Sequence, residues 1–134
     1  MKFYLDTNIW IDYFENRSDG LRPLGEFAFQ FLKKVVETNS VIYYSDLVKT
    51  ELNKVLTKKV IDPKFNDIPN LVYVEFTKED YFFAKKIVST HNIHLADAFH
   101  TAIASRIKAV LITRDNHFDY LDFVEVKKPE EVLF

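Results

Sequence analysis

The stretch Lys2-Phe3-Tyr4-Leu5-Asp6-Thr7-Asn8 joins a short apolar run to three polar residues that end it. An apolar run of this length, bounded by polar residues, is typical of a buried strand. Directly after it, apolar and aromatic side chains recur at the spacing of one helix face, at Ile9, Trp10, Tyr13 and Phe14. The stretch therefore predicts a strand that ends on an acid and leads at once into an amphipathic helix.

The same alternation of strand and helix continues along the chain. Further strands are predicted at residues 41–44, 71–74 and 109–112, with a fifth at an edge over residues 123–126. Helical spacing covers residues 24–35, 45–58, 77–90 and 95–103. Such alternation is typical of an α/β layer fold with a mostly parallel sheet of four to five strands, here in one domain over residues 1–134.

Residues known to begin helices support these boundaries. Pro23 precedes the first long helix, Ser45 can cap the second, and Thr77 with Asp80 resembles a capping box. Residues 59–70 contain two prolines and lack clear periodicity, so they are predicted to form a loop.

The composition excludes several classes of protein. The chain has 134 residues, 48% of them hydrophobic, which suits one packed domain. It has no cysteine, which excludes disulfides and thiolate chemistry. No apolar run approaches the length of a membrane span, and Asp6 and Asp12 interrupt the apolar stretch near the amino terminus, unlike a signal peptide. A cytoplasmic protein is therefore expected.

The net charge gives an ambiguous indication about nucleic acid. Its value of −2 by itself disfavours a nucleic-acid partner. If several acids surround bound divalent ions, however, the ions cancel that local charge and the remaining surface is basic on balance. Lys49, Lys54 and Arg114 lie near acidic candidates in the sequence and are candidates for phosphate contacts, although solvated helix faces also explain them.

Two acids follow predicted strands. Asp6 ends the first strand and Asp115 comes shortly after the strand at residues 109–112. Carboxylates at the carboxyl ends of parallel strands gather at one edge and suit hard divalent cations. Helix capping by Thr7 or Asn8 is an alternative role for the first motif, and an Asp-Asn turn is the alternative for the second.

Two further acids fall on predicted helices. Glu51 is expected inside an apolar arc between Leu47 and Val55, where an unpaired carboxylate would be costly. A metal ion, a position at the rim, or an ion pair with Lys49, Lys54 or a distant base would each relieve that cost. Asp97 lies opposite an apolar stripe near a helix start, and small neighbours around it would let a ligand approach. Thr113 and Asn116 offer neutral oxygens that could orient a carboxylate or a water molecule.

The histidines do not form a recognisable zinc motif. His94, Asp97 and His100 are three residues apart, but no His-x-x-x-His pair exists and their helical angles diverge. His94 is predicted to open a helix. His100 and His117 are expected to line a cleft or to be polar surface, and the sequence leaves their roles open.

Taken together, the acidic motifs resemble the PIN-domain nucleases, and among them the VapC-type toxins of toxin–antitoxin pairs. The resemblance covers nearly the whole chain and rests on an ordered set of motifs. These are Leu5-Asp6-Thr7-Asn8, the isolated Glu51, Leu95-Ala96-Asp97-Ala98 and Thr113-Arg114-Asp115-Asn116-His117-Phe118. Two departures are the proline-bearing residues 59–70, where many relatives have helices, and His117, where some carry another acid.

The resemblance implies a three-layer α/β/α sandwich and an endoribonuclease that depends on Mg²⁺ or Mn²⁺ and leaves a 5′-phosphate and a 3′-hydroxyl. It also implies a homodimer and inhibition by a cognate antitoxin. The acids that match the family's motifs are Asp6, Glu51, Asp97 and Asp115, with Thr7, Asn8, Thr113 and Asn116 as supporting groups. Neither the RNA and its cleavage site nor the number of metal ions follows from the sequence.

Two other interpretations remain. One is a catalytically degenerate PIN-like module that binds RNA or protein through the same groove. The other is a different α/β phosphohydrolase or phosphotransferase with acids at strand ends. A haloacid-dehalogenase-like enzyme would need an acid where Asn8 stands, and a receiver domain would need a late lysine to match Asp46, which is not evident.

Overall fold

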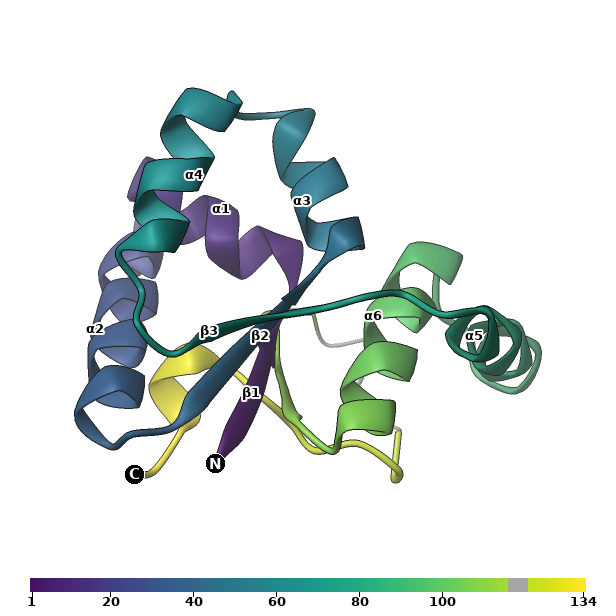
Figure 1. Cartoon of the computed structure of the whole chain (residues 1–134). Coiled ribbons are helices and arrows are strands. Elements are labelled where there is room, and N and C mark those ends of the chain that lie inside the picture. The colour runs from purple at the N-terminus through teal and green to yellow at the C-terminus, as the bar shows by residue number, and fades with distance from the viewer. Residues whose placement is uncertain (116–120) are drawn as a thin grey trace.

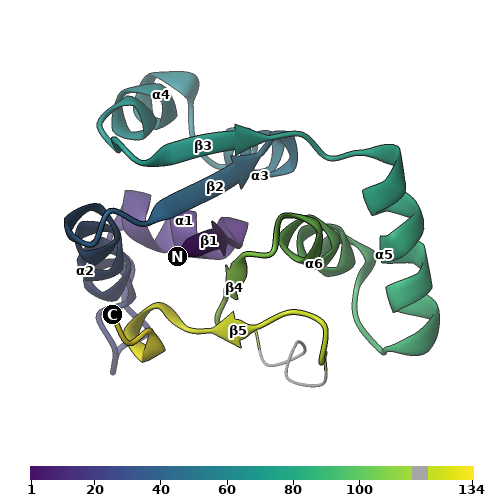
Figure 2. The same cartoon turned by 60° about the horizontal axis from the view of Figure 1, so that its bottom comes forward.

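The structure is a computed structural model that describes residues 1–115 and 121–134. Within these residues, five parallel strands form one sheet in the order β3-β2-β1-β4-β5 (Figure 2). The strands are β1 (Lys2–Leu5), β2 (Val41–Ser45), β3 (Leu71–Val74), β4 (Val110–Ile112) and β5 (Val126–Lys127).

Helices cover both faces of the sheet and make three layers (Figure 1). One face carries α1 (Thr7–Glu15), α2 (Leu24–Glu37) and α4 (Lys58–Asn66), and the other carries α5 (Lys78–Thr90) and α6 (Leu95–Ile107). Helix α3 (Asp46–Asn53) continues beyond the end of β2, and the short 3₁₀ helix η2 (Pro129–Glu131) lies near the carboxyl terminus. The α/β/α sandwich predicted from the sequence is confirmed.

The strand order places a topological switch at the centre of the sheet. From β1 the chain moves outward through β2 to β3, and it then returns to the other side of β1 as β4. Leu5 pairs with Ile112, and the Asp6 N–H donates to the Ile112 carbonyl at 2.9 Å. Ligands of parallel sheets bind at such a switch, outside the carboxyl ends of the strands.

The central strand anchors the hydrophobic core. Phe3, Tyr4 and Leu5 are fully buried, as expected for a strand covered on both faces. On the α1 side, the fully buried Trp10 ring meets the Phe65 ring edge-on, with centroids 4.8 Å apart. The core thus ties β1 and α1, which carry Asp6 between them, to the layers around them.

The region after β2 differs from the sequence prediction. The helix predicted to reach Lys58 ends at Asn53, and the predicted loop over residues 59–70 contains α4. Pro63 lies inside α4, where its ring removes one backbone hydrogen bond. Ile61 and Phe65 are nevertheless buried one helical turn apart. Burial of these two side chains outweighs the hydrogen bond lost at the proline. The helix was not predicted because the two prolines interrupt the helical spacing of apolar residues in the sequence.

Several predicted helix boundaries are confirmed. The Ser45 hydroxyl accepts from the Val48 N–H at 3.3 Å, and Thr77 and Asp80 form the predicted reciprocal capping box. The same Asp80 carboxylate, almost fully buried, accepts two hydrogen bonds from the Arg106 guanidinium at 2.9 and 3.0 Å. The cap of α5 therefore also fastens α5 to α6.

The edge strand is shorter and later than predicted. It spans Val126–Lys127 instead of residues 123–126, and it pairs with Leu111 and Ile112. The Thr113 N–H donates to the Lys127 carbonyl at 3.0 Å, which extends this pairing to the end of β4.

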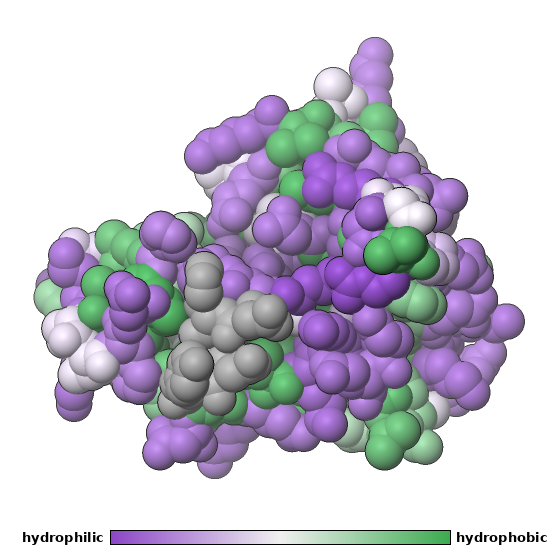
Figure 3. Space-filling model, turned by 180° about the vertical axis from the view of Figure 1, so that it is seen from behind, coloured by the Kyte–Doolittle hydropathy of each residue, from purple (hydrophilic) through white to green (hydrophobic). Residues whose placement is uncertain are grey.

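The surface is mixed in character. Figure 3 shows a face dominated by hydrophilic residues, with hydrophobic residues gathered towards the side that α5 occupies. Among the residues that the structure describes, no helix has the length and apolar character needed to cross a membrane.

Replacing Phe65 by alanine tests the docking of α4. Phe65 is only 6% exposed, so Phe65→Ala is expected to lower the free energy of unfolding by about 3–5 kcal/mol. Val60, on the same helix, is 41% exposed, and Val60→Ala should change that free energy by less than about 0.5 kcal/mol. Urea unfolding followed by circular dichroism measures both, and equal effects would contradict the docked position of α4.

Candidate active site

Asp6 lies at the switch point and is held there by a neighbouring strand. It is the N-cap residue of α1, but its side chain makes no capping hydrogen bond. Instead, its buried carboxylate accepts a hydrogen bond from the Thr113 hydroxyl at 3.0 Å. The capping role considered for this motif therefore does not explain the Asp6 side chain, whose oxygens point toward the end of β4.

Thr113 joins Asp6 to the second acid-bearing strand end. Its hydroxyl, which donates to Asp6, also accepts from the Asp115 N–H at 3.2 Å. The turn that follows β4 is thus built on Thr113 and places the half-buried Asp115 beside the same edge of the sheet.

Glu51 reaches the site through a partner that is far away in the sequence. Its carboxylate lies 2.7 Å from His100 Nε2. Glu51 is half-buried and not enclosed by an apolar arc from Leu47 to Val55: α3 ends before Val55, which is 52% exposed, and the Glu51 side chain is itself 37% exposed. The ion pair with a distant base, one of the alternatives left open by the sequence, describes the observed contact.

His100 forms a buried junction instead of polar surface. It is 2% exposed on α6, and its Nδ1 lies 2.7 Å from the Tyr4 hydroxyl, which lies 2.8 Å from Ser45 Oγ. Because the Glu51 carboxylate accepts hydrogen bonds, Nε2 carries a proton. Position 100 falls between Ala96 and Ala104 at helical spacing, and the neighbouring Ile103 is apolar. This pattern in the sequence could have predicted that His100 is buried and therefore requires polar partners.

The charges in this network stabilise one another. Burial opposes the charged imidazole, but the hydrogen bond to Glu51 and the charges of Asp6, Glu51 and Asp97 outweigh it, so the pKa of His100 is raised above 6.5. Burial likewise opposes the Glu51 carboxylate, yet the hydrogen bond and charge of His100 lower its pKa below 4.5.

The remaining acids repel one another. Burial and the charge of Glu51 raise the pKa of Asp6, although His100 and Thr113 act in the opposite direction. Burial, followed by the charges of Asp6 and Asp115, raises the pKa of Asp97. All four acids predicted from the sequence are therefore linked through their electric fields at one edge of the sheet.

The donor set suits a hard divalent cation in its chemistry. Carboxylate oxygens are the ligands that Mg²⁺ and Mn²⁺ take, and a cation would relieve the repulsion felt by Asp6 and Asp97. Within residues 1–115 and 121–134, however, no three His, Asp or Glu side chains are grouped closely enough to hold a metal ion.

The supporting residues fall into different environments. Thr7 is buried next to Asp6, and Asn8 is exposed on the first turn of α1. Thr113 contacts Asp6 directly, as described above. Asn116 and His117 lie outside the described residues.

Two of the basic residues considered for phosphate contacts are already paired. Arg114 is 13% exposed at its side chain and binds Glu130, while Lys49 lies 3.1 Å from Asp62. His94 precedes α6 as its N-cap residue, as predicted, without a capping hydrogen bond from its side chain.

Comparison with known proteins assigns the family. The model of the PIN domain matches residues 3–124. The chain belongs to the PIN domain family. Comparison of this PIN domain with curated protein sequences gives no match.

Solved structures with the same fold include several VapBC complexes. A DNA-bound VapBC from Salmonella typhimurium superposes with a TM-score of 0.72 at 15% identity, covering 96% of this chain and 98% of the other. VapBC2 from Rickettsia felis, bound to a promoter DNA fragment, gives 0.70 at 19% identity with the same coverages. VapC20 from Mycobacterium tuberculosis, a toxin that cleaves the sarcin-ricin loop, gives 0.65 at 16% identity, covering 93% and 98%.

Titration of His100 tests the network. Its pKa should lie above 6.5 and should fall in Glu51→Gln, because the variant loses the carboxylate that stabilises the imidazolium. A raised folded-state pKa contributes stability that is complete below about pH 6.5 and is lost as the pH rises through that pKa. The lowered pKa of Glu51 sets the acid limit, because its contribution is lost as the pH falls from 4.5 through the folded-state value.

Imidazole NMR gives the pKa directly, and urea unfolding at several pH values gives the stability. Glu79→Gln removes an exposed carboxylate on α5 and serves as the matched control, with no change expected in the pKa of His100. A His100 pKa that is the same in wild type and Glu51→Gln would show that the contact does not persist in solution.

Proposed function

We propose that this PIN domain is a Mg²⁺- or Mn²⁺-dependent endoribonuclease and the toxin of a toxin–antitoxin pair. The observation that carries the proposal is the set of mutually repelling acids at the switch point, where burial, followed by the charges of Asp6 and Asp115, raises the pKa of Asp97. Such repulsion is costly unless a cation or a proton offsets it.

Asp6, Glu51, Asp97 and Asp115 would hold the cation. When bound, it supplies the positive charge that lowers the pKa of a water molecule and stabilises the leaving oxygen of the phosphodiester. The protein's own contribution is orientation. Thr113 orients one oxygen of Asp6, and His100 holds one oxygen of Glu51.

A basic turn next to Glu51 supports RNA as the substrate. Lys54, Lys58 and Lys59 are exposed from the end of α3 to the first turn of α4. Burial opposes the Glu51 carboxylate, and the charge of Lys54 adds to the effect of His100 in lowering its pKa. Exposed lysines near a phosphodiester-cleaving site attract the backbone of a nucleic acid. This turn replaces Arg114 and Lys49 as the expected phosphate contact.

The antitoxin partner is proposed from the relatives. Structures with this fold include VapBC complexes and a toxin–antitoxin complex from Klebsiella pneumoniae, the latter with a TM-score of 0.68 at 21% identity. A small gene upstream that overlaps this one and encodes a DNA-binding domain with a helical tail would support the toxin role.

A homodimer is proposed from the surface of β3 and α5. In the part of the chain that the structure describes, β3 forms an edge of the sheet. Val72 and Tyr73 on β3 are 41% and 47% exposed, and Phe82 on α5 is 59% exposed. Exposed apolar side chains and an open strand edge are each typical of association surfaces.

Asp6→Asn is expected to reduce RNA cleavage by about 100-fold or more, because it removes the charge of the most buried of the four site acids while preserving its shape. Labelled RNA with Mg²⁺ or Mn²⁺ measures the rate, and the products should carry a 5′-phosphate and a 3′-hydroxyl. Asp67→Asn changes an exposed acid at the end of α4 and should leave the rate unchanged.

Persistence of cleavage in Asp6→Asn or in excess EDTA would contradict the metal-dependent mechanism. Calorimetry with Mn²⁺ separates the non-catalytic alternative: wild type should bind Mn²⁺, and Glu51→Ala should bind it more weakly. No heat in either protein would favour a module that binds RNA or protein without cleaving.

Phe82→Glu tests the dimer. Light scattering after gel filtration should give the wild type twice the 15.9 kDa of one chain, and the variant should dissociate at least about tenfold more readily. Phe29→Glu, at a residue of α2 that is 46% exposed, is the control and should remain dimeric. A monomeric wild type would overturn the dimer proposal.

A further inference from the structure

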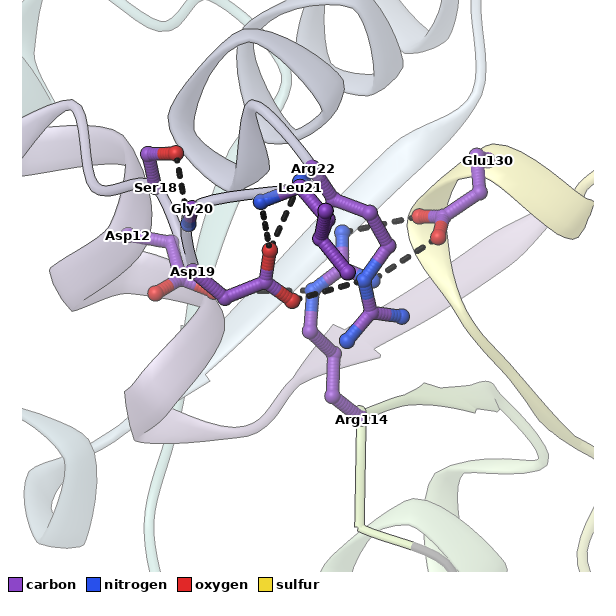
Figure 4. A network of polar contacts seen from close by, with 8 residues as sticks. All are labelled: Asp12, Ser18, Asp19, Gly20, Leu21, Arg22, Arg114 and Glu130. Carbon is purple, nitrogen blue, oxygen red and sulfur yellow. Dashed lines mark hydrogen bonds and ion pairs between the residues drawn. The ribbon is translucent and has the colours of Figure 1, made fainter.

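A network of ion pairs lies behind the turn that carries Thr113 and Asp115 (Figure 4). The Arg114 guanidinium donates two hydrogen bonds to the Glu130 carboxylate, both at 2.8 Å. Its Nε lies 3.6 Å from the Asp12 carboxylate on α1. Two parallel bonds between a guanidinium and a carboxylate fix orientation as well as distance.

Arg114 has different partners from the residues beside it in the turn. Thr113 bonds the Asp6 side chain and the Asp115 N–H on the acidic side of the turn. Arg114, between them, reaches Asp12 and Glu130 on the α1 side, where it also lies over the Phe27 ring. Arg114 is the residue between Thr113 and Asp115, so holding its guanidinium restrains the backbone of the turn that carries both neighbours.

Glu130 comes from a part of the chain that lies outside the family match. The PIN model covers residues 3–124, whereas Glu130 belongs to η2. The Lys128 N–H caps η2 by donating to the Glu131 carboxylate at 2.8 Å, and Pro129 is buried. The carboxylate that receives Arg114 is therefore held on a short, anchored helix.

The local charges favour this arrangement. Burial opposes the Glu130 carboxylate, but its hydrogen bond and attraction to Arg114 outweigh burial and lower its pKa, with Arg22 adding to the effect. Asp12 is buried, and burial raises its pKa although the charges of Arg114 and Arg17 act in the opposite direction. Arg114 is thus shared by two acids, and these contacts hold its guanidinium away from the acidic edge.

We propose that Arg114 and Glu130 are positioning residues that clamp the turn from Thr113 to Asp115 in the geometry required for RNA cleavage. The inference rests on the proposed function for its catalytic consequence, while its structural consequence can be measured without activity. The carboxyl-terminal segment then forms part of the site's scaffold, although it contributes no acid to the site.

Glu130→Gln preserves the size of the side chain but replaces one acceptor oxygen with an NH₂ group. Its kcat for RNA cleavage should fall about tenfold with little change in KM, because displacement of a catalytic group affects the chemical step more than substrate binding. Arg114→Lys should be equally impaired, since lysine cannot form both bonds. The double variant should be no worse than Arg114→Lys alone, because the two residues act as one unit.

Glu125→Gln is the matched control. It changes a carboxylate of the same segment that is 61% exposed at its side chain and 4.0 Å from Lys127, and it should behave as wild type. Assays run well below the unfolding temperature of each variant separate positioning from stability, because a purely structural role would lower that temperature and leave kcat unchanged.

Amide hydrogen exchange provides the readout that does not require activity. In Glu130→Gln the Asp115 amide, which donates to Thr113, should lose protection by about tenfold as the turn opens locally. The Leu111 amide, which donates to Glu125 at 2.8 Å inside the sheet, should keep its protection.

The two readouts separate failure of the clamp from failure of the proposed function. A wild type that cleaves no RNA would overturn the function, and the exchange of the Asp115 amide would still decide whether the clamp exists. An unchanged Asp115 amide in Glu130→Gln would overturn the clamp. An active wild type whose Glu130→Gln and Arg114→Lys variants retain full kcat would overturn its role in cleavage.

Discussion

The candidate site depends on one hydrogen bond across the switch point, from the Thr113 hydroxyl to the buried Asp6 carboxylate. A carboxylate in this position has little access to water, so burial raises its pKa. The Thr113 hydroxyl recovers part of the lost solvation and also joins the ends of β1 and β4. Because the next turn is built on the same hydroxyl, through the Asp115 N–H, the position of the second acid depends on the first contact.

The buried His100 side chain positions Glu51, the acid on α3. Without a base at this position, Glu51 would add a further negative charge close to Asp6. The contact between Glu51 and His100 places a hydrogen-bond donor that can carry positive charge among the acids. The Tyr4 hydroxyl contacts the other ring nitrogen and is itself paired with Ser45. The acidic edge thus contains an internal counter-charge at His100. Burial and the charges of Asp6 and Asp115 nevertheless raise the pKa of Asp97, against the attraction of His100 and His94.

Much of the architecture could be predicted because it is encoded by local patterns. The apolar run of β1, the Ser45 cap and the Thr77–Asp80 box each appear within a few residues, and each is present in the structure. Helix α4 could not be predicted in this way, because the proline inside it breaks the local pattern and its stability comes from burying Ile61 and Phe65 against other elements. The late start of β5 is also tertiary in origin, since it follows from pairing with β4.

The sequence by itself determined the alternation of strands and helices, the four acids at the ends of elements, and the motifs that resemble a PIN domain. These properties depend on residue type and spacing, which are local. Only the tertiary structure decided the partners of the charged side chains. Thr113 binds Asp6, His100 binds Glu51, and Glu130 binds Arg114, which the sequence suggested as a phosphate contact. These pairs are separated by 107, 49 and 16 residues, so the packing of distant elements sets them and no local pattern records them.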